Sequence, residues 1–311
     1  MALLSIVVPL LNEAENLAAL HERLSATAAK LDRDVELIFV DDGSTDESFA
    51  RLVALREKDP RVRVVRFSRN FGSHAACLAG YVHCKGDHAV IISADLQDPP
   101  ELILDLVAAA KDADVVWASR EARDDPALTM LFSSIYNRLM RKIALPNYPE
   151  KGFDFVIVAR RVLDVIVSRR ERNSSLFAQI LWTGFRQKSV PYARVARRVG
   201  QSKWTFWKKV KLALDSIVSF SYLPVRLMSV VGILCAFLGA LYALLVIVLR
   251  VAWGAPITGW ASLMVVVLVM GGVQMITLGV IGEYLWRTLD EARARPPFIV
   301  AESVGFEPPS R

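Results

Sequence analysis

Short apolar runs alternate with helical patterns through the first half of the chain. The apolar runs are Leu3 to Leu10, Val35 to Val40, Val62 to Phe67, His88 to Ser93 and Asp114 to Ser119. Between the first two runs, leucine recurs at helical spacing at Leu17, Leu20, Leu24 and Leu31. Continuous apolar strands that alternate with helices are typical of a parallel sheet covered on both faces. The pattern predicts an α/β fold whose ligands bind beyond the carboxyl ends of the strands.

Two long apolar segments dominate the second half. Residues 227–249 and 260–281 carry no charge, and a rise of about 1.5 Å per residue lets each helix cross roughly 30 Å of hydrocarbon. Lys and Arg crowd the segment before the first of them and follow the second, whereas the connecting loop carries only Arg250. This asymmetry predicts a two-helix hairpin in the inner (plasma) membrane, with both termini cytosolic.

Residues 204–221 precede the first apolar segment and predict an amphipathic helix. Trp207, Val210 and Leu214 share one face of it, and several lysines lie off that face. Such a helix lies in the membrane interface; an ordinary surface helix packed on the core is the alternative. The expected domains are therefore a cytosolic domain at 1–203, an interfacial helix at 204–224, transmembrane helices within 225–287 and a loose cytosolic tail at 288–311.

The net charge of the chain predicts an anionic partner. The chain is 53% hydrophobic with a formal net charge of +6, and its apolar residues concentrate after Pro224. A basic chain favours nucleic acid, a phosphorylated ligand or acidic lipid, and charge alone does not choose among them. The three cysteines, Cys77, Cys84 and Cys235, lack the spacing of a disulfide framework or a thiolate metal site.

Acidic segments follow two of the predicted strands. Residues 40–46, Val-Asp-Asp-Gly-Ser-Thr-Asp, end the second run, where a carboxylate can accept a hydrogen bond from a base or ribose. The alternative is a plain turn at Asp42-Gly43 with Asp46 as a helix cap. No glycine pattern for a dinucleotide or a P-loop is present in the sequence, so a different nucleotide site is expected.

Residues 93–100, Ser-Ala-Asp-Leu-Gln-Asp-Pro-Pro, follow the fourth run. They offer the hard oxygen ligands that Mg²⁺ or Mn²⁺ prefers. A divalent ion here would neutralise charge that grows on a departing diphosphate. Capping of the next helix is the plainer explanation for Asp98 alone.

Together these segments resemble the family 2 glycosyltransferases, and the whole chain resembles the polyprenyl-phosphate branch of the dolichol-phosphate mannose synthase type. The most specific matches are SIVVPLLNEAENL, VDDGSTD, SRNFGSHAACLAG, SADLQDPPELI and VGQSKWTFW ahead of two spans. The resemblance implies a GT-A, Rossmann-like domain that transfers a sugar from a nucleotide donor to polyprenyl phosphate. UDP is the expected base and GDP the alternative. A homo-oligomer packed through the spans is expected, and nucleic acid is not an expected partner.

The resemblance also assigns roles to residues. The donor nucleotide is bound by Pro9, Leu11, Glu13, Asp41, Ser93, Ala94 and Arg120, the metal by Asp95 and Gln97, and the lipid phosphate by Arg198 and Lys203. Asp154 matches the carboxylate beside the transfer site, so Asp154 and Asp95 are the implied catalytic residues.

Three positions depart from the family pattern. Ser93 stands where the family has the first Asp of Asp-x-Asp, so one acidic group near the metal is missing. Met130 to Phe132 lack the basic residue that relatives carry ahead of the serines matched by Ser133 and Ser134; Arg138, Arg141 and Lys142 are the alternative basic residues. Val156 replaces an arginine frequent in relatives, which indicates a subgroup with a different sugar.

The acceptor chemistry follows from elementary properties of phosphate. A phosphate monoester has a second pKa near 6, so a polyprenyl phosphate is mostly dianionic at neutral pH and already nucleophilic. No strong base is needed, and Asp154 is expected to orient the acceptor more than to take a proton. Direct attack inverts the anomeric centre.

Two alternative functions are considered. A processive polysaccharide synthase would share the nucleotide motifs, but such enzymes carry Gln-x-x-Arg-Trp, which Gln201-Ser202-Lys203-Trp204 does not match. A noncatalytic membrane scaffold derived from such an enzyme is supported only by Ser93.

Overall fold

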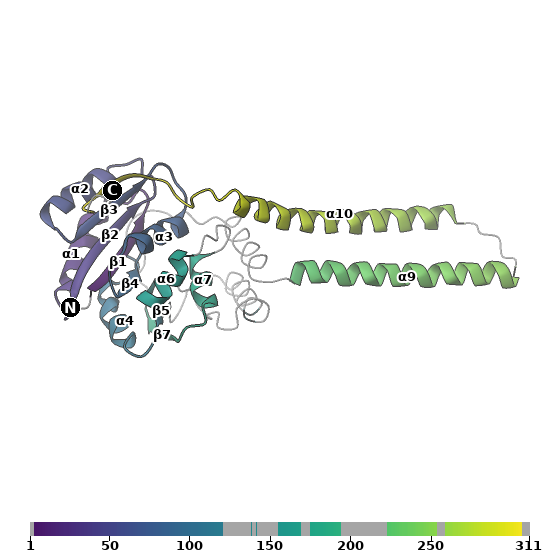
Figure 1. Cartoon of the computed structure of the whole chain (residues 1–311), viewed down its shortest axis with the longest axis horizontal. Helices are drawn as coiled ribbons and strands as arrows, with labels where there is room; N and C mark the ends of the chain where they lie inside the picture. Colours follow the sequence, from purple (N-terminus) through teal and green to yellow (C-terminus); the bar gives the residue numbers. More distant parts are fainter. Residues whose placement is uncertain are drawn as a thin grey trace. The chain divides into compact units, whose positions relative to one another are not determined.

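The computed structural model describes residues 3–120, 138, 141, 155–168, 175–193, 223–253 and 259–306. It divides into two compact units (Figure 1). The first comprises Met1–Ser216 together with Arg295–Arg311, and the second comprises Ile217–Ala294. The segments before and after the apolar helices therefore belong to one folded unit.

The first unit contains a mixed sheet in the order β7-β5-β6-β4-β1-β2-β3-β8. Its strands are β1 (Leu3–Leu10), β2 (Asp34–Asp41), β3 (Val62–Phe67), β4 (His88–Ile91), β5 (Val115–Arg120), β6 (Phe155–Ala159), β7 (Gln187–Tyr192) and β8 (Val300–Val304). Strands β3, β2, β1 and β4 run parallel, whereas β6 is antiparallel to both β4 and β5. The predicted apolar runs are confirmed as strands, with small differences at their ends.

Helices cover both faces of the sheet. They are α1 (Leu17–Ala28), α2 (Ser48–Lys58), α3 (Ser73–His83), α4 (Ile103–Ala109), which follows the 3-10 turn η1 (Pro100–Leu102), α6 (Arg160–Ser168) and α7 (Leu176–Trp182). Alternate residues of β1 such as Ile6 join Leu20 of α1 and Leu106 of α4 in one core. Val7 points the other way, where Gly80 of α3 approaches so closely that an added Cβ would meet Val7 Cγ1 at 2.1 Å.

The last strand was not expected from the sequence. Val300–Val304, in the segment predicted to be a loose tail, pairs antiparallel with β3 as β8. Phe298 also stacks on Phe67 with ring centroids 5.1 Å apart. The prediction of a loose tail is wrong for this segment because β8 covers an edge that β3 would otherwise expose.

The second unit contains two long apolar helices, α9 (Leu223–Trp253) and α10 (Trp260–Ala292). Both extend beyond the predicted apolar segments. Their candidate spans are Val225–Leu249 and Ser262–Ala292, and the most apolar stretch of each is not buried. Helices of this length and composition are suited to hydrocarbon. Residues 204–222, the bulk of the predicted interfacial helix, lie outside the described residues.

Candidate active site

The carboxyl ends of β1 and β2 are joined by hydrogen bonds between the loops that follow them. The Ser44 Oγ accepts a hydrogen bond from the Asn12 backbone N–H at 2.9 Å, and the Ser48 Oγ accepts one from the Glu13 N–H at 3.0 Å. The Asn12 side chain in turn accepts one from the Thr45 N–H at 2.8 Å. These bonds join the loop that carries Leu11 and Glu13 to the segment that follows Asp41.

Asn12 does not cap helix α1. Asn12 and Glu15 have the spacing of a capping box, but α1 begins only at Leu17 and its N-cap is Asn16. Asn12 instead has a φ of 52°, the left-handed conformation that Asn tolerates better than most residues. Its side chain accepts the hydrogen bond from Thr45 in the loop after β2, which lies far from Asn12 in the sequence.

Asp41 is a buried carboxylate at the carboxyl end of β2. It ends β2, opposite Leu10 of β1, and its side chain is 0% exposed. Its Oδ1 accepts a hydrogen bond from the Ser44 N–H at 2.9 Å. Its Oδ2 has no hydrogen-bond partner among the described residues and lies 3.7 Å from the Arg66 Nε.

The other predicted donor residues from this side lie close by in the chain. Pro9 is in β1, and Leu11 and Glu13 follow it; all three are partly buried. The Glu13 carboxylate accepts a hydrogen bond from the Asn16 side chain at 2.7 Å. This carboxylate is therefore held in place by the start of α1.

Asp42, which the sequence offered only as part of a turn with Gly43, anchors a neighbouring loop. Its carboxylate accepts hydrogen bonds from the N–H groups of Phe71 at 2.7 Å and Gly72 at 3.0 Å, and so anchors the loop after β3. Burial raises the pKa of Asp42, and these hydrogen bonds offset part of the rise. Gly43 has a φ of 72°, and an added Cβ would lie 2.6 Å from the backbone carbon of Arg69.

Asp46 contacts the start of α2 but is not its N-cap, which is Glu47 and has no side-chain cap bond; the prediction of Asp46 as the cap is wrong by one residue. Its Oδ1 accepts a hydrogen bond from the N–H of Ser48, the first residue of α2, at 3.0 Å, and its Oδ2 accepts one from the Ala14 N–H at 3.3 Å. Burial raises the pKa of Asp46, but hydrogen bonds from Ser48 and Ala14 outweigh this, so the pKa is lowered.

The loop after β4 carries the predicted metal ligands. Asp95 is 9% exposed, and its Oδ1 accepts a hydrogen bond from the Gln97 N–H at 3.2 Å. Leu96 between them has a φ of 58°, so the chain turns sharply at the carboxylate. Ser93 is partly buried and Ala94 is buried.

Asp98 does not cap the following helix. It is 1% exposed and accepts a 2.5 Å hydrogen bond from the hydroxyl of Tyr192, at the end of β7. The 3-10 turn that follows has no side-chain cap. The capping interpretation of Asp98 is wrong because a partner 94 residues away engages its carboxylate.

The described residues contain no group of three or more His, Cys, Asp or Glu side chains that could hold a metal ion. Asp95 and Gln97 supply a carboxylate and an amide oxygen on one tight turn. Mg²⁺ is bound in many enzymes by one or two carboxylates, with substrate phosphates and water completing its octahedron. The two side chains fit that mode of binding and do not form an all-protein cage.

The remaining predicted site residues are described only in part. Arg120 ends β5, and only its backbone is described. Asp154 lies outside the described residues, directly before β6, which begins at Phe155. Arg198 and Lys203, and the stretch Met130 to Ser134, also lie outside them.

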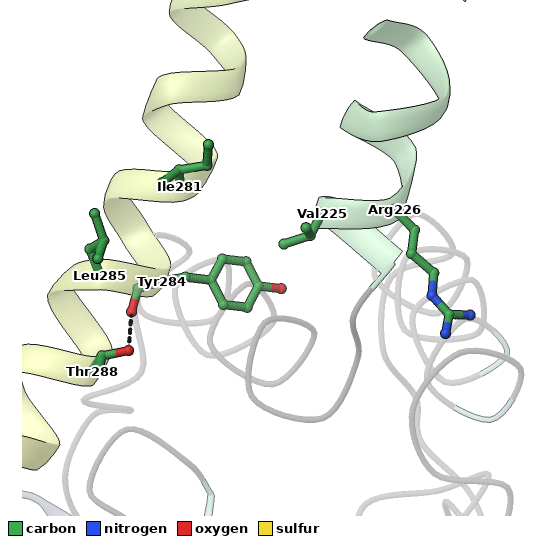
Figure 2. A pocket seen from close by; sticks show the side chains of 6 residues that line it. All are labelled: Val225, Arg226, Ile281, Tyr284, Leu285 and Thr288. Carbon is green, nitrogen blue, oxygen red and sulfur yellow. Dashed lines mark hydrogen bonds between the residues drawn. The ribbon is translucent and has the colours of Figure 1, made fainter. Parts of the chain in front are cut away.

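The second unit has a groove at the end of the helices where the chain enters α9 and leaves α10 (Figure 2). The groove has a volume of about 530 Å³ and is lined by Val225, Arg226, Ile281, Tyr284, Leu285 and Thr288. The Thr288 hydroxyl donates a hydrogen bond to the Tyr284 carbonyl at 2.9 Å. None of these residues belongs to the loops that follow β1, β2 and β4.

Comparison with known proteins identifies the chain's family. The model of Glycosyl transferase family 2 matches residues 5–177, from β1 into α7 and more than half of the chain. This sheet with acidic loops at its strand ends is that of a GT-A glycosyltransferase. The chain belongs to glycosyl transferase family 2, as its motifs predicted.

Similar proteins match nearly the whole chain. An uncharacterized glycosyltransferase of Bacillus subtilis, YkcC, is 38% identical over 97% of this chain and 94% of its own length. The SfII prophage-derived bactoprenol glucosyl transferase of Shigella flexneri is 36% identical over 96% of this chain and 98% of its own length. Among solved structures, the mannosyltransferase PcManGT of Pyrobaculum calidifontis, in complex with GDP-Man and Mn²⁺, matches 91% of this chain and 87% of its own with 17% identity and a TM-score of 0.46.

Proposed function

We propose that the chain transfers a sugar, with inversion, from a nucleoside diphosphate donor to the phosphate of a polyprenyl lipid at the cytosolic face of the membrane. The observation that carries this proposal is the 36% identity to a bactoprenol glucosyl transferase, which extends over 96% of the chain and therefore includes both apolar helices. A soluble acceptor would not require those helices. UDP is the preferred base.

The donor half of the site is assigned to the loops after β1, β2 and β4. Pro9, Leu11, Glu13 and Asp41 are proposed to bind the base and ribose, with Ser93 and Ala94 from the loop after β4. The Oδ1 of Asp41 is hydrogen-bonded, whereas its buried Oδ2 is not. A buried oxygen without a partner favours a ligand that can donate a hydrogen bond to it. This supports a role for Asp41 in selecting the nucleotide. Arg120 is proposed to contact the diphosphate.

Asp95 and Gln97 are the proposed ligands of Mg²⁺ or Mn²⁺. When bound, such an ion supplies Lewis-acid stabilisation to the diphosphate leaving group. The chain's contribution is to hold the Asp95 carboxylate on a tight turn, where the Gln97 N–H bonds one of its oxygens. Tyr192 supports the same loop through Asp98.

The acceptor half is assigned to Asp154, Arg198 and Lys203. The reaction brings two polyanions together, so positive side chains beside the lipid phosphate lower the electrostatic barrier. The phosphate oxygen attacks the anomeric carbon and the nucleoside diphosphate leaves with the bonding electrons. Asp154 is proposed to orient the acceptor, since the dianionic phosphate needs no general base.

We further propose that both ends of the chain are cytosolic. A chain that leaves one folded unit, passes through two helices and returns to the same unit crosses a membrane an even number of times. The pairing of β8 with β3 supports this, because β8 follows α10 and β3 precedes α9. The catalytic unit then faces the compartment in which nucleotide sugars are made.

The proposal is tested with the full chain in nanodiscs that contain undecaprenyl phosphate. A panel of radiolabelled UDP- and GDP-sugars is supplied with Mg²⁺, and label is measured in an organic-extractable, mild-acid-labile lipid. We expect label from one donor, and release of nucleoside diphosphate only when the lipid is present. Release that does not depend on the lipid, or label in a polymer, would contradict the proposal.

A further inference from the structure

Arg66 of β3 lies between two carboxylates from distant parts of the chain. Its Nε is 3.7 Å from the Oδ2 of Asp41, its register neighbour in β2. Its Nη1 is 3.0 Å from the Oε1 of Glu302, its register neighbour in β8. The guanidinium carbon lies 4.6 Å from the centroid of the Phe49 ring, within the range of a cation–π contact.

The two carboxylates differ in burial and in bonding. Asp41 is 0% exposed, whereas the side chain of Glu302 is 53% exposed and that of Arg66 is 34% exposed. Only the contact with Glu302 is a hydrogen bond. Arg66 therefore lies beside the Asp41 Oδ2 without satisfying it, while Glu302 holds the guanidinium from the solvent side.

The position of Glu302 is fixed by its surroundings in the sheet. The β3–β8 register shifts between Arg66 and Phe67, and such an irregularity re-aims nearby side chains. The Ser68 N–H donates to the Ile299 carbonyl at 3.0 Å, which continues the contact beyond the strand. Glu302 thus depends on the segment that follows the second apolar helix.

We propose that Arg66 is a gate over Asp41, and that Glu302 is a positioning residue that stabilises the open position of this gate during donor binding. This rests on the proposed role of Asp41 in the nucleoside pocket. The unbonded Oδ2 has almost no exposed surface, and the Arg66 Nε lies 3.7 Å from it. In this proposal an N–H or O–H group of the nucleotide reaches the Oδ2 when Arg66 swings outward. When Arg66 moves outward, it keeps its ion pair with Glu302.

The physical basis is a competition for one carboxylate oxygen. Without the negative charge of Glu302, the Arg66 guanidinium has no second carboxylate to pair with, so it turns towards Asp41. The ligand must then break an ion pair between the buried Asp41 and the partly exposed Arg66. The expected consequence is weaker binding of the nucleotide-sugar donor with an unchanged kcat. The reason is that Arg66 is in the open position both in the bound donor complex and in the transition state.

The experiment measures binding of UDP, with GDP in parallel, to the full chain in nanodiscs, and the KM and kcat for the donor that the panel identifies. Glu302→Gln is expected to raise the nucleotide Kd and donor KM about two- to fivefold, the range that a partly exposed ion pair supports. The value of kcat and the KM for lipid should not change. Asp112→Asn is the matched control, since it breaks the exposed 3.1 Å pair with Lys188 of β7, at the other edge of the sheet.

Arg66→Gln separates gating from a general effect on the sheet. With the gate removed, adding Glu302→Gln should have no further effect, so the double variant should bind UDP like Arg66→Gln alone. Additive losses in the double variant would overturn the proposal. So would a Glu302→Gln variant that binds nucleotide as tightly as the wild type.

Asp41→Asn distinguishes failure of this inference from failure of the proposed function. If Asp41→Asn weakens nucleotide binding while Glu302→Gln does not, only the gate is wrong. If Asp41→Asn binds UDP and GDP like the wild type, the assignment of Asp41 to the nucleoside pocket is wrong, and the gate with it.

Discussion

The hydroxyl of Tyr192 donates a 2.5 Å hydrogen bond to the buried carboxylate of Asp98. This bond ties the end of β7 to the loop that also carries Asp95. Tyr192→Phe leaves Asp98 buried with one partner fewer, which should cost about 1 to 3 kcal/mol of stability. Thermal unfolding in detergent measures the loss, and Tyr242→Phe, at an exposed residue of α9, is the control. Equal melting temperatures for the two variants would show that the bond contributes nothing.

Asp95→Asn should reduce turnover by at least about tenfold, because each 1.4 kcal/mol or so of lost transition-state stabilisation costs that factor. The substitution keeps the size of the side chain, so the fold should survive. Ser93→Asp should lower the metal concentration for half-maximal activity by restoring a second carboxylate. Transfer rates against Mg²⁺ and Mn²⁺ concentration test both variants. Full activity in excess chelator would refute the metal assignment.

Gly43 and Gly184 form a matched pair of left-handed glycines. Their φ angles are 72° and 73°, but an added Cβ at Gly43 would meet backbone at 2.6 Å, whereas nothing lies within 4 Å of one at Gly184. Gly184→Ala should therefore cost about 1 to 2 kcal/mol for backbone conformation alone. Gly43→Ala should cost more and should also weaken nucleotide binding, because the loop after β3 must shift. Similar unfolding free energies for both variants would contradict this.

Asp59 should contribute stability that depends on pH. Hydrogen bonds from Arg61, with His21 at 2.9 Å, hold the pKa of Asp59 well below its ordinary 3.8. A lowered acid pKa stabilises the fold above about pH 3.8, and this stabilisation is lost as pH falls towards the lowered value. Asp59→Asn should thus melt below the wild type at about pH 7, and the difference should shrink below about pH 3.8. A difference that does not change with pH would point to packing instead.

Lys203→Ala should raise the apparent KM for polyprenyl phosphate more than that for the donor. The reason is its place in the sequence between the catalytic domain and the apolar helices, where a lipid headgroup would lie. Initial rates at varied lipid content in nanodiscs give the measurement, and Lys188→Ala on β7 is a control lysine. Weakened nucleotide binding with unchanged lipid kinetics would reassign Lys203 to the donor.

The sequence predicts the parts of this molecule that depend on local pattern. Continuous apolar runs identify β1 to β5 because buried parallel strands need apolar residues on both faces. The ends of these apolar runs also predict Asp41 and Asp95 at the ends of strands. The structure has Asp41 at the end of β2 and Asp95 in the loop after β4. Length and charge pattern were enough to predict α9 and α10 as apolar helices.

Contacts between distant residues could not be read in this way. Asp98 pairs with Tyr192 and Asp42 with the loop at Phe71, and neither carboxylate differs in sequence from an ordinary turn residue. Strand β8 was missed because its middle residues are exposed and its partner strand lies more than 200 residues earlier. The apolar stretch Phe298 to Ala301 was the one available signal.

The pairing of β3 with β8 also sets an order of assembly during synthesis. The ribosome makes β8 only after both apolar helices, so the sheet of the catalytic unit remains incomplete until synthesis has passed α10. Until then β3 is an open edge, which can pair with other chains. Final closure of the enzyme's sheet therefore follows synthesis of both apolar helices, and a nascent chain stalled within α9 or α10 lacks the strand that carries Glu302.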